Sequence, residues 1–157
     1  MRIKLAITVM VPADQAWQLI GDEFHAIGNW VSAIEASEAD SKPSIGTVRT
    51  CHLAGGKRAT ERVTQYSNDA KTLSYVATSG IPFWMLEATN HWTVQPINSE
   101  CCRISIEPTI FLVWWVQPIT PLLRFGVSRM INQTAEELKY GLETGKIHPR
   151  KVAMQSR

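Results

Sequence analysis

The stretch PLLRFGVSRMINQTAEELKYGLETG (residues 121–145) decides the fold, because it is a long amphipathic segment near the end of the chain. A helix from Pro121 to Thr144 would be about 36 Å long, enough to cross an entire sheet. Gly145 is well suited to cap its C-terminal end. The residues that recur at steps of three and four, and so share one helix face, are Leu123, Val127, Met130, Ile131, Thr134, Leu138 and Leu142.

The residues before this helix have the pattern of strands and short turns that is typical of consecutive hairpins. Between residues 46 and 94, strand-like runs are separated by short turn sequences at 55–56, 67–69 and 80–82. Links this short join antiparallel neighbours. The sequence therefore predicts an antiparallel sheet.

A further turn at 96–100 leads into residues 101–116, the most apolar run of the chain, which we predict to be one long strand. Glu107, Pro108, Gln117 and Pro118 fall inside or beside it. A membrane span needs about 20 apolar residues, so this run predicts no transmembrane segment.

The N-terminal residues predict one more strand followed by two short helices. Residues 1–9 alternate charged or small residues with aliphatic ones, which is the pattern of a strand with one buried face and not of a secretory signal. Pro12 suits the first turn of a helix that runs to Ile20. A second short helix is expected over 22–29, before Trp30 and the next strand.

Length and composition predict one cytoplasmic domain over residues 1–145, with a flexible polar tail over 146–157. Sixteen basic and fourteen acidic residues are spread along the chain, without the clustered basic face that nucleic acid or anionic lipid requires. Six tryptophans in a chain this short suggest a roomy interior.

The cysteines give no metal-binding pattern. Cys51, Cys101 and Cys102 lack a Cys-x-x-Cys spacing, and the four histidines lack a His-x-x-x-His spacing. We expect buried or free thiols, no metal and no cofactor.

The order of strand, two short helices, six strands and a long helix resembles the START-like superfamily (SRPBCC, Bet v 1-like), and within it the polyketide cyclase/dehydratase-like group. The resemblance implies an α+β helix-grip fold, in which a curved antiparallel sheet of about seven strands wraps around the C-terminal helix. It covers nearly the whole chain up to Gly145 but specifies chemistry poorly, because one scaffold hosts many functions. The matching residues are Val11 to Trp17, Phe24, Trp30, Gly46 to Arg49, Gly55-Gly56, Glu61 to Val63, Asp69, Tyr75 and Pro82.

Arg49 and Glu61 are the first candidate site residues. Strand alternation puts Arg49, Cys51 and Leu53 on one face, and the resemblance implies that Glu61 turns inward on the facing strand. A cavity carboxylate close to Arg49 would orient a ligand hydroxyl or take a proton from the carbon next to a ketone. The alternative is an ordinary surface ion pair.

The strand over 84–94 has two possible inward faces. Alignment to the family without gaps from Glu61 brings Tyr75, Glu87, Thr89 and His91 to the cavity, where His91 beside Glu87 would act as acid or base. The binary pattern favours the opposite face, because Trp84, Leu86, Ala88 and Trp92 form the more apolar set. The sequence does not decide which of the two faces points into the cavity.

The end of the sheet and the long helix supply the other candidates. Glu107 beside Pro108 is either an inward functional carboxylate or part of an edge irregularity. Phe111 is a candidate cavity residue, and Ile131, Ala135 and Leu138 would form the cavity floor. One of Trp114 and Trp115, with Phe83 and Trp84, is a candidate for an exposed apolar rim that contacts a ligand, a partner or a membrane surface.

Three functions follow from these patterns. The leading prediction is that the chain binds a small hydrophobic molecule, such as a lipid, polyketide or isoprenoid-like compound, in an internal cavity. The second is a cyclase or dehydratase that uses Glu61 or His91 as general base and Arg49 to stabilise an enolate. The third is a protein-interaction module, such as a homodimer, that uses the aromatic rim.

Overall fold

A seven-stranded antiparallel sheet forms the main layer of the structure, a computed structural model that describes residues 1–156. The strand order is β1-β7-β6-β5-β4-β3-β2, so the first strand crosses to pair with the last one. The predicted antiparallel sheet of about seven strands is confirmed. Its strands are β1 (Leu5–Val9), β2 (Ala36–Ala39), β3 (Val48–Leu53), β4 (Lys57–Ser67), β5 (Thr72–Ser79), β6 (Met85–Pro96) and β7 (Cys102–Leu112).

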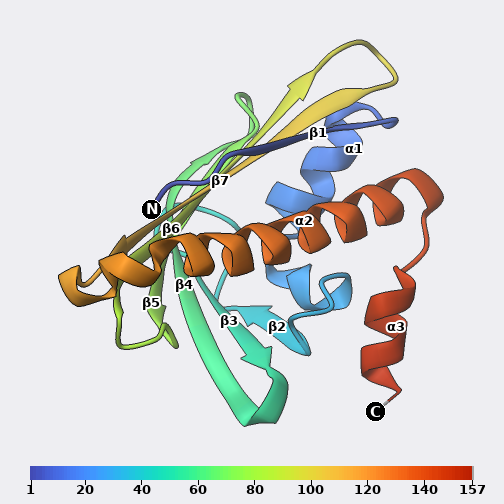
Figure 1. The fold of residues 1–157 in the computed structure, drawn as a ribbon. Helices are drawn as coiled ribbons and strands as arrows, with labels where there is room; N and C mark the ends of the chain where they lie inside the picture. Colours follow the sequence, from blue (N-terminus) through green and yellow to red (C-terminus); the bar gives the residue numbers. More distant parts are fainter. Residues whose placement is uncertain (157) are drawn as a thin grey trace.

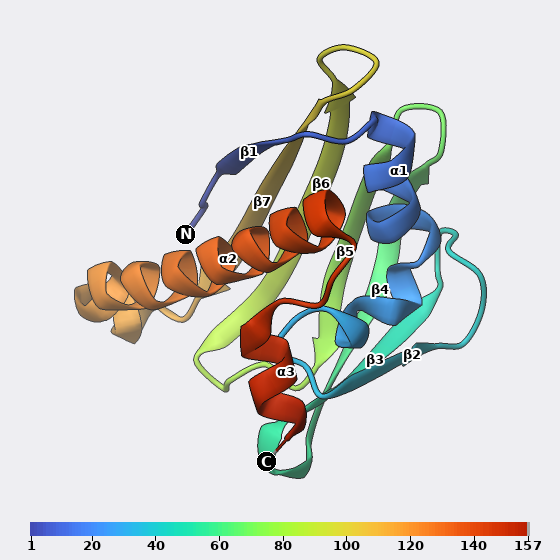
Figure 2. The ribbon, with the colours of Figure 1, turned by 90° about the vertical axis from the view of Figure 1, so that its right-hand side faces the viewer.

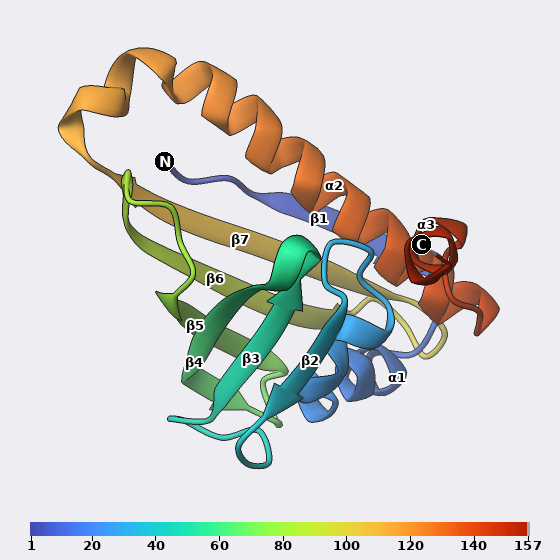
Figure 3. The same ribbon diagram turned by 90° about the horizontal axis from the view of Figure 1, so that it is seen from below.

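The long helix α2 (Thr120–Thr144) lies across the concave side of this curved sheet (Figure 1, Figure 3). Gly145 ends it in the left-handed conformation, with φ of 68°, which a residue without Cβ adopts at no steric cost. Ile131, Ala135 and Leu138 lie on its buried face. The helix-grip prediction is therefore confirmed.

Short helices close one end of the space between sheet and helix (Figure 2). They are α1 (Ala13–Trp17), the π-helical turn η1 (Gln18–Asp22) and the 3₁₀ helix η2 (Phe24–Asn29). The indole Nε1 of Trp17 donates a hydrogen bond of 2.5 Å to Oδ1 of Asn68 in the turn between β4 and β5. This contact fixes the helical end of the molecule to the sheet.

The apolar run that was predicted as one strand over 101–116 divides into two elements. Strand β7 ends at Leu112, and the 3₁₀ helix η4 (Trp114–Ile119) leads into α2. The backbone N–H of Val113 donates to the carbonyl of Trp84, which extends the pairing of β6 and β7 beyond Leu112. The chain turns there, so Trp114 and Trp115 are both exposed and neither is inside.

The last residues form a helix, where the sequence predicted a flexible polar tail. Helix α3 (Pro149–Gln155) lies beside the segment between η2 and β2 (Figure 2). Lys151 is fully buried, and its ammonium donates to the carbonyls of Ile34 and Glu35. Lys151 is thus a buried anchor within a segment whose other residues are mostly exposed.

The remaining short element, the 3₁₀ turn η3 (Ala54–Gly56), joins β3 to β4. Gly55 has φ of 76° and Gly56 has φ of 74°, and this left-handed pair allows the tight link that the sequence predicted.

Candidate functional site

A cavity of about 400 Å³ lies between the concave face of the sheet and α2. Its volume falls within the range of roughly 300–1,000 Å³ that is typical of small-molecule sites. The wall is mostly aliphatic, with a few polar groups from β3 to β6. Its lining comes from four regions: 27–34 at and after the end of η2, the strands β3 to β7, the loop 80–82, and Val127, Met130, Ile131 and Thr134 of α2.

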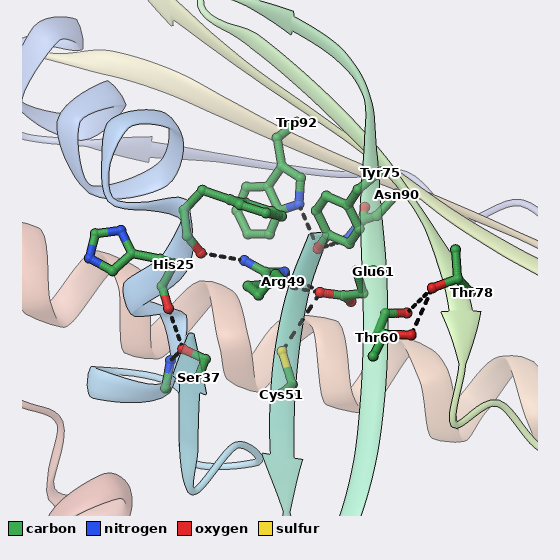
Figure 4. Close-up of polar contacts among 12 residues, drawn as sticks. His25, Ser37, Arg49, Cys51, Thr60, Glu61, Tyr75, Thr78, Asn90 and Trp92 are labelled. Carbon is green, nitrogen blue, oxygen red and sulfur yellow. Dashed lines mark hydrogen bonds and ion pairs between the residues drawn. The ribbon is translucent and has the colours of Figure 1, made fainter. Parts of the chain in front are cut away.

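An ion pair between Arg49 and Glu61 forms the polar centre of this wall (Figure 4). The two residues lie directly opposite each other in the register of β3 and β4, so both side chains point to the same face. Nε and Nη2 of Arg49 donate to Oε2 of Glu61, at 2.8 and 2.5 Å. Nη1 donates to the carbonyl of Phe24, at 2.7 Å.

The guanidinium of Arg49 is enclosed, with 2% of the residue exposed. It lies 3.8 Å from the ring centre of Phe24 and 4.9 Å from that of Tyr75. Burial alone would lower the pKa of Arg49, but the charge of Glu61 and, after it, contributions from Tyr75 and Cys51 together outweigh burial and raise this pKa above its ordinary value. Arg49 therefore carries a fixed positive charge that Glu61 holds in place.

Tyr75 and Asn90 form a second polar group beside the pair. They are cross-strand partners on β5 and β6, and the Tyr75 hydroxyl accepts hydrogen bonds from Asn90 Nδ2 at 3.0 Å and Trp92 Nε1 at 3.3 Å. Burial, followed by the nearby Glu61 charge, raises the pKa of Tyr75, so this phenol stays neutral at physiological pH.

Two acceptor oxygens in this wall lack a hydrogen-bond partner within residues 1–156. Oδ1 of Asn90 is buried and unpartnered, and every hydrogen bond to Glu61 goes to Oε2, which leaves Oε1 unused. A buried polar atom without a partner costs about 1–3 kcal/mol. That cost applies to Oδ1 of Asn90, which is enclosed within the wall, whereas Oε1 of partly exposed Glu61 is a free acceptor at the cavity surface.

Cys51 completes the polar part of the wall without offering a reactive thiolate. Its Sγ donates to Oε2 of Glu61 at 3.7 Å. Burial, followed by the charge of Glu61, raises the pKa of Cys51 to about 12. At neutral pH this thiol is protonated.

The structure turns four of the predicted site residues away from the cavity. Glu87, His91, Glu107 and Phe111 lie on the outer face of the sheet, because the cavity face of β6 is formed by Ala88, Asn90 and Trp92 and that of β7 by even-numbered residues. The inward placement that the gapless alignment implied for Glu87 and His91 is therefore corrected. The binary pattern gave the right face for Ala88 and Trp92, but Leu86, next to the register shift between Met85 and Glu87, is exposed. Of the predicted strand residues, Arg49, Glu61 and Tyr75 line the cavity. Thr89 also borders it, although it has the strand parity of Glu87 and His91.

The outward residues have polar partners of their own. His91 bonds Ser74 through Nδ1 at 2.6 Å and Thr93 through Nε2 at 3.1 Å. Glu107 pairs with Lys4 at 2.9 Å and with Arg2 at 3.4 Å. The hydrogen bond from Lys4 is the main reason that the pKa of Glu107 is lowered. These contacts belong to the outer surface of the sheet.

The predicted cavity floor is only partly the observed one. Ile131 lines the cavity, whereas Ala135 and Leu138 are buried in the core beyond it. Sequence reasoning missed Asn90 and Thr134 as lining residues. Asn90 shares the strand parity of Trp92, so the binary pattern carried a signal for it.

Within residues 1–156, no group of three or more His, Cys, Asp or Glu side chains is arranged to hold a metal ion. None of the helices in the same residues combines the length and the apolar character needed to cross a bilayer.

Comparisons with known proteins agree with this geometry. The family model described as "Polyketide cyclase / dehydrase and lipid transport" matches residues 1–143. No curated protein sequence matches the chain. Many solved structures share the fold at low sequence identity, and three of them serve as examples.

The protein XoxI from Bacillus cereus superposes with a TM-score of 0.75 at 18% identity, covering 94% of this chain and 99% of that one. A norcoclaurine synthase point mutant from Thalictrum flavum gives 0.71 at 16% identity, covering 90% and 93%. Ara h 8.0201 gives 0.71 at 13% identity, covering 90% and 97%. These likenesses concern the fold, and the family match over most of the chain shows that it belongs to the polyketide cyclase/dehydrase and lipid transport family.

Proposed function

We propose that this protein binds a small, largely apolar molecule that carries a hydrogen-bond donor. The free Oε1 of Glu61, in the wall of a mostly aliphatic cavity of about 400 Å³, is the observation that carries the proposal. A ligand hydroxyl or amine would donate to this oxygen, and its apolar part would cover the aliphatic wall. Lipids, polyketides and isoprenoid-like alcohols all contain such groups.

The charges of the wall favour a ligand that donates a hydrogen bond over a ligand that carries a carboxylate. The only cation of the lining, Arg49, already gives three hydrogen bonds to Glu61 and Phe24 and is covered by two aromatic rings. A ligand carboxylate would instead meet the free oxygen of Glu61. Like charges in a partly buried site repel strongly, so acids should bind more weakly than the corresponding alcohols.

The related structures are compatible with such ligands. One structure of norcoclaurine synthase contains dopamine and hydroxybenzaldehyde, both of which carry hydroxyl groups on an aromatic ring. This is a likeness of fold at 16% identity, so it supports the kind of ligand and not its identity.

Matched ligand sets test the proposal. We would measure binding by calorimetry and native mass spectrometry for a hydrocarbon, an alcohol and a carboxylate on each of three skeletons: naphthalene, biphenyl and decalin. On any skeleton that binds, the alcohol should bind about tenfold more tightly than the carboxylate. Equal affinities, or no binding of any set, would refute the proposal.

One variant locates the binding group. Glu61→Gln should weaken alcohol binding about fivefold, since it replaces the free carboxylate oxygen. Glu87→Gln is the matched control at an exposed position outside the cavity and should leave affinity unchanged.

A second candidate function is catalysis with Glu61 as general base. Its Oε1 is free and its side chain keeps 21% exposure toward the cavity, which suits a base that takes a proton from the carbon next to a ketone. His91 does not share this position. If a ketone substrate is found, Glu61→Gln should abolish turnover in an enzyme, whereas a binding protein would lose only the modest affinity described above.

A further inference from the structure

A group of large apolar side chains is exposed at one end of the molecule. We name it the apolar rim and define it as Phe83, Trp114, Trp115, Ile119, Leu122 and Phe125. Phe83 is 84% exposed and Trp114 is 82% exposed. Phe83 stacks on Trp115 with ring centres 5.9 Å apart, which joins the β5–β6 loop to η4. Monomeric soluble proteins seldom leave so many large apolar side chains together in water.

The apolar rim lies beside the opening of the cavity. Pro82 and Met130 line the cavity and are themselves exposed, and they belong to the same two chain segments as the rim. These segments form the end of the molecule opposite to α3, where α2 begins (Figure 3). A surface that covered the rim would therefore face the entrance of the binding site.

The local charge of the rim differs from that of the whole chain. Residues 108–135 contain Arg124 and Arg129 but no acidic residue, and residues 80–86 contain no charged residue. The nearby Glu107 is neutralised by Lys4 and Arg2. The even spread of charge along the sequence argued against an anionic partner, but the fold places Arg124 and Arg129 next to an aromatic surface. The acids that border this stretch are Glu136, which pairs with Arg150, and the exposed Glu87, so two arginines face one acid that has no ion pair within residues 1–156.

We propose that the apolar rim docks the protein on a membrane surface that contains anionic lipids, with the cavity opening toward the lipids. Aromatic side chains are favoured at the membrane interface, and arginines beside them attract anionic headgroups. A second copy of the chain fits this surface less well. Two copies that met rim to rim would bring four arginines together without an acid from the same stretch.

Vesicle co-sedimentation tests this docking. The full chain is mixed with vesicles of phosphatidylcholine alone, or of phosphatidylcholine and phosphatidylglycerol in equal amounts. We expect binding to the anionic vesicles that weakens as salt is raised. Trp114→Ser with Leu122→Ser should reduce the partition coefficient about tenfold or more. Ile45→Ser with Ile147→Ser is the matched control, because both residues are exposed and lie outside the rim.

The arginines are tested in the same way. Arg124→Gln with Arg129→Gln should reduce binding to anionic vesicles about tenfold, whereas the control pair Arg103→Gln with Lys146→Gln should not. Binding of the matched alcohols in solution should be the same in all these variants, so a failure of docking is separable from a failure of the cavity proposal.

Four results would overturn the inference: no binding to either vesicle, equal binding to both, binding that the rim variants leave unchanged, or a dimer in solution that Trp114→Ser with Leu122→Ser converts to a monomer. The last result would make the rim a self-association surface.

Discussion

Replacing Glu61 with leucine should cost the fold more than replacing Glu61 and Arg49 together. Glu61→Leu leaves a buried guanidinium with one acceptor, the carbonyl of Phe24, and two aromatic rings. Breaking a buried ion pair by removing one partner costs about 3–5 kcal/mol. The lower end applies, since Glu61 keeps 21% exposure of its side chain and water in the cavity will reach the orphaned charge.

A loss of about 3 kcal/mol corresponds to a fall in melting temperature of roughly 6–12 °C for a domain of this size. The double variant Arg49→Met, Glu61→Leu removes both charges and keeps similar volumes. It should lose about 1–2 kcal/mol, mainly because the Phe24 carbonyl loses its hydrogen bond from Arg49. Arg49→Met alone should lose about 2 kcal/mol, so the two single losses sum to more than the double loss.

The measurement is urea unfolding followed by tryptophan fluorescence, with the four proteins of the cycle compared at one pH. Glu87→Leu is the control, because Glu87 is exposed on the outer face of the sheet and should change stability by about 0.5 kcal/mol at most. Additive losses, or a Glu61→Leu variant within about 1 kcal/mol of the wild type, would refute the idea that the two charges hold each other inside the fold.

Three further predictions concern other contacts. Asn90→Leu should change the free energy of unfolding by about 1 kcal/mol at most, since the removal of an unsatisfied buried oxygen offsets the lost hydrogen bond to Tyr75, whose hydroxyl keeps its bond from Trp92; urea midpoints would check this, and a large loss would contradict it. Ending the chain after Gly145 should cost about 2–4 kcal/mol, because the buried carboxylate of Glu137 loses its bond from Arg150; an unchanged melting temperature would instead indicate a dispensable tail. The pKa of Glu107 is lowered by its hydrogen bond from Lys4 below the ordinary value of 4.5, so the stability that it contributes is present above pH 4.5 and is lost as pH falls through the lowered pKa. On acidification, Glu107→Gln should therefore lose less free energy of unfolding, measured by urea denaturation, than the wild type. The difference should be less than about 1 kcal/mol because the cations are exposed; equal losses would contradict the assignment.

The features that the sequence predicted correctly are those encoded by neighbouring residues. The period of α2, the cap at Gly145 and the glycine turn at 55–56 each depend on a few consecutive side chains. The division of 101–116 into β7 and η4 was missed, because the apolar run continues across the turn and the bond from Val113 to Trp84 comes from a distant segment.

The faces of β6 show where local patterns stop being sufficient. Paired residues of neighbouring strands share a face, and the register places Tyr75 opposite Asn90 and Leu73 opposite Trp92. A change of one residue in the connecting loop exchanges the two faces of the next strand. The alignment without gaps assumed the loop length of other proteins, so it turned His91 inward. The alternation of apolar and polar residues, which reflects burial in the chain itself, favoured the correct face for Ala88 and Trp92.

Charged residues that are buried by the fold were the hardest to foresee. Glu137 looks like one of the polar positions of an amphipathic helix, yet it is 1% exposed and accepts hydrogen bonds from the backbone N–H and hydroxyl of Ser32. Lys151 is buried by a contact with carbonyls more than a hundred residues away in sequence. Such partners are set by tertiary structure, and the spacing of residues along the chain does not predict them.

The positions of the polar groups and of the apolar rim together define how a ligand would enter. The acceptors at Glu61 and Asn90 lie on the enclosed sheet wall, whereas Met130 and Pro82 mark the open side near the rim. If the rim rests on a bilayer, the entrance faces the headgroup layer, where the hydroxyl of a membrane-dissolved alcohol also lies. The polar end would then enter first and the apolar part would follow from the acyl region, so no step would expose the whole ligand to water. We therefore expect anionic vesicles to speed ligand uptake in the wild type and to have no such effect in the Trp114→Ser, Leu122→Ser variant, as measured by stopped-flow fluorescence with a naphthyl alcohol. Equal rates in the two proteins would separate docking from uptake and refute this order of events.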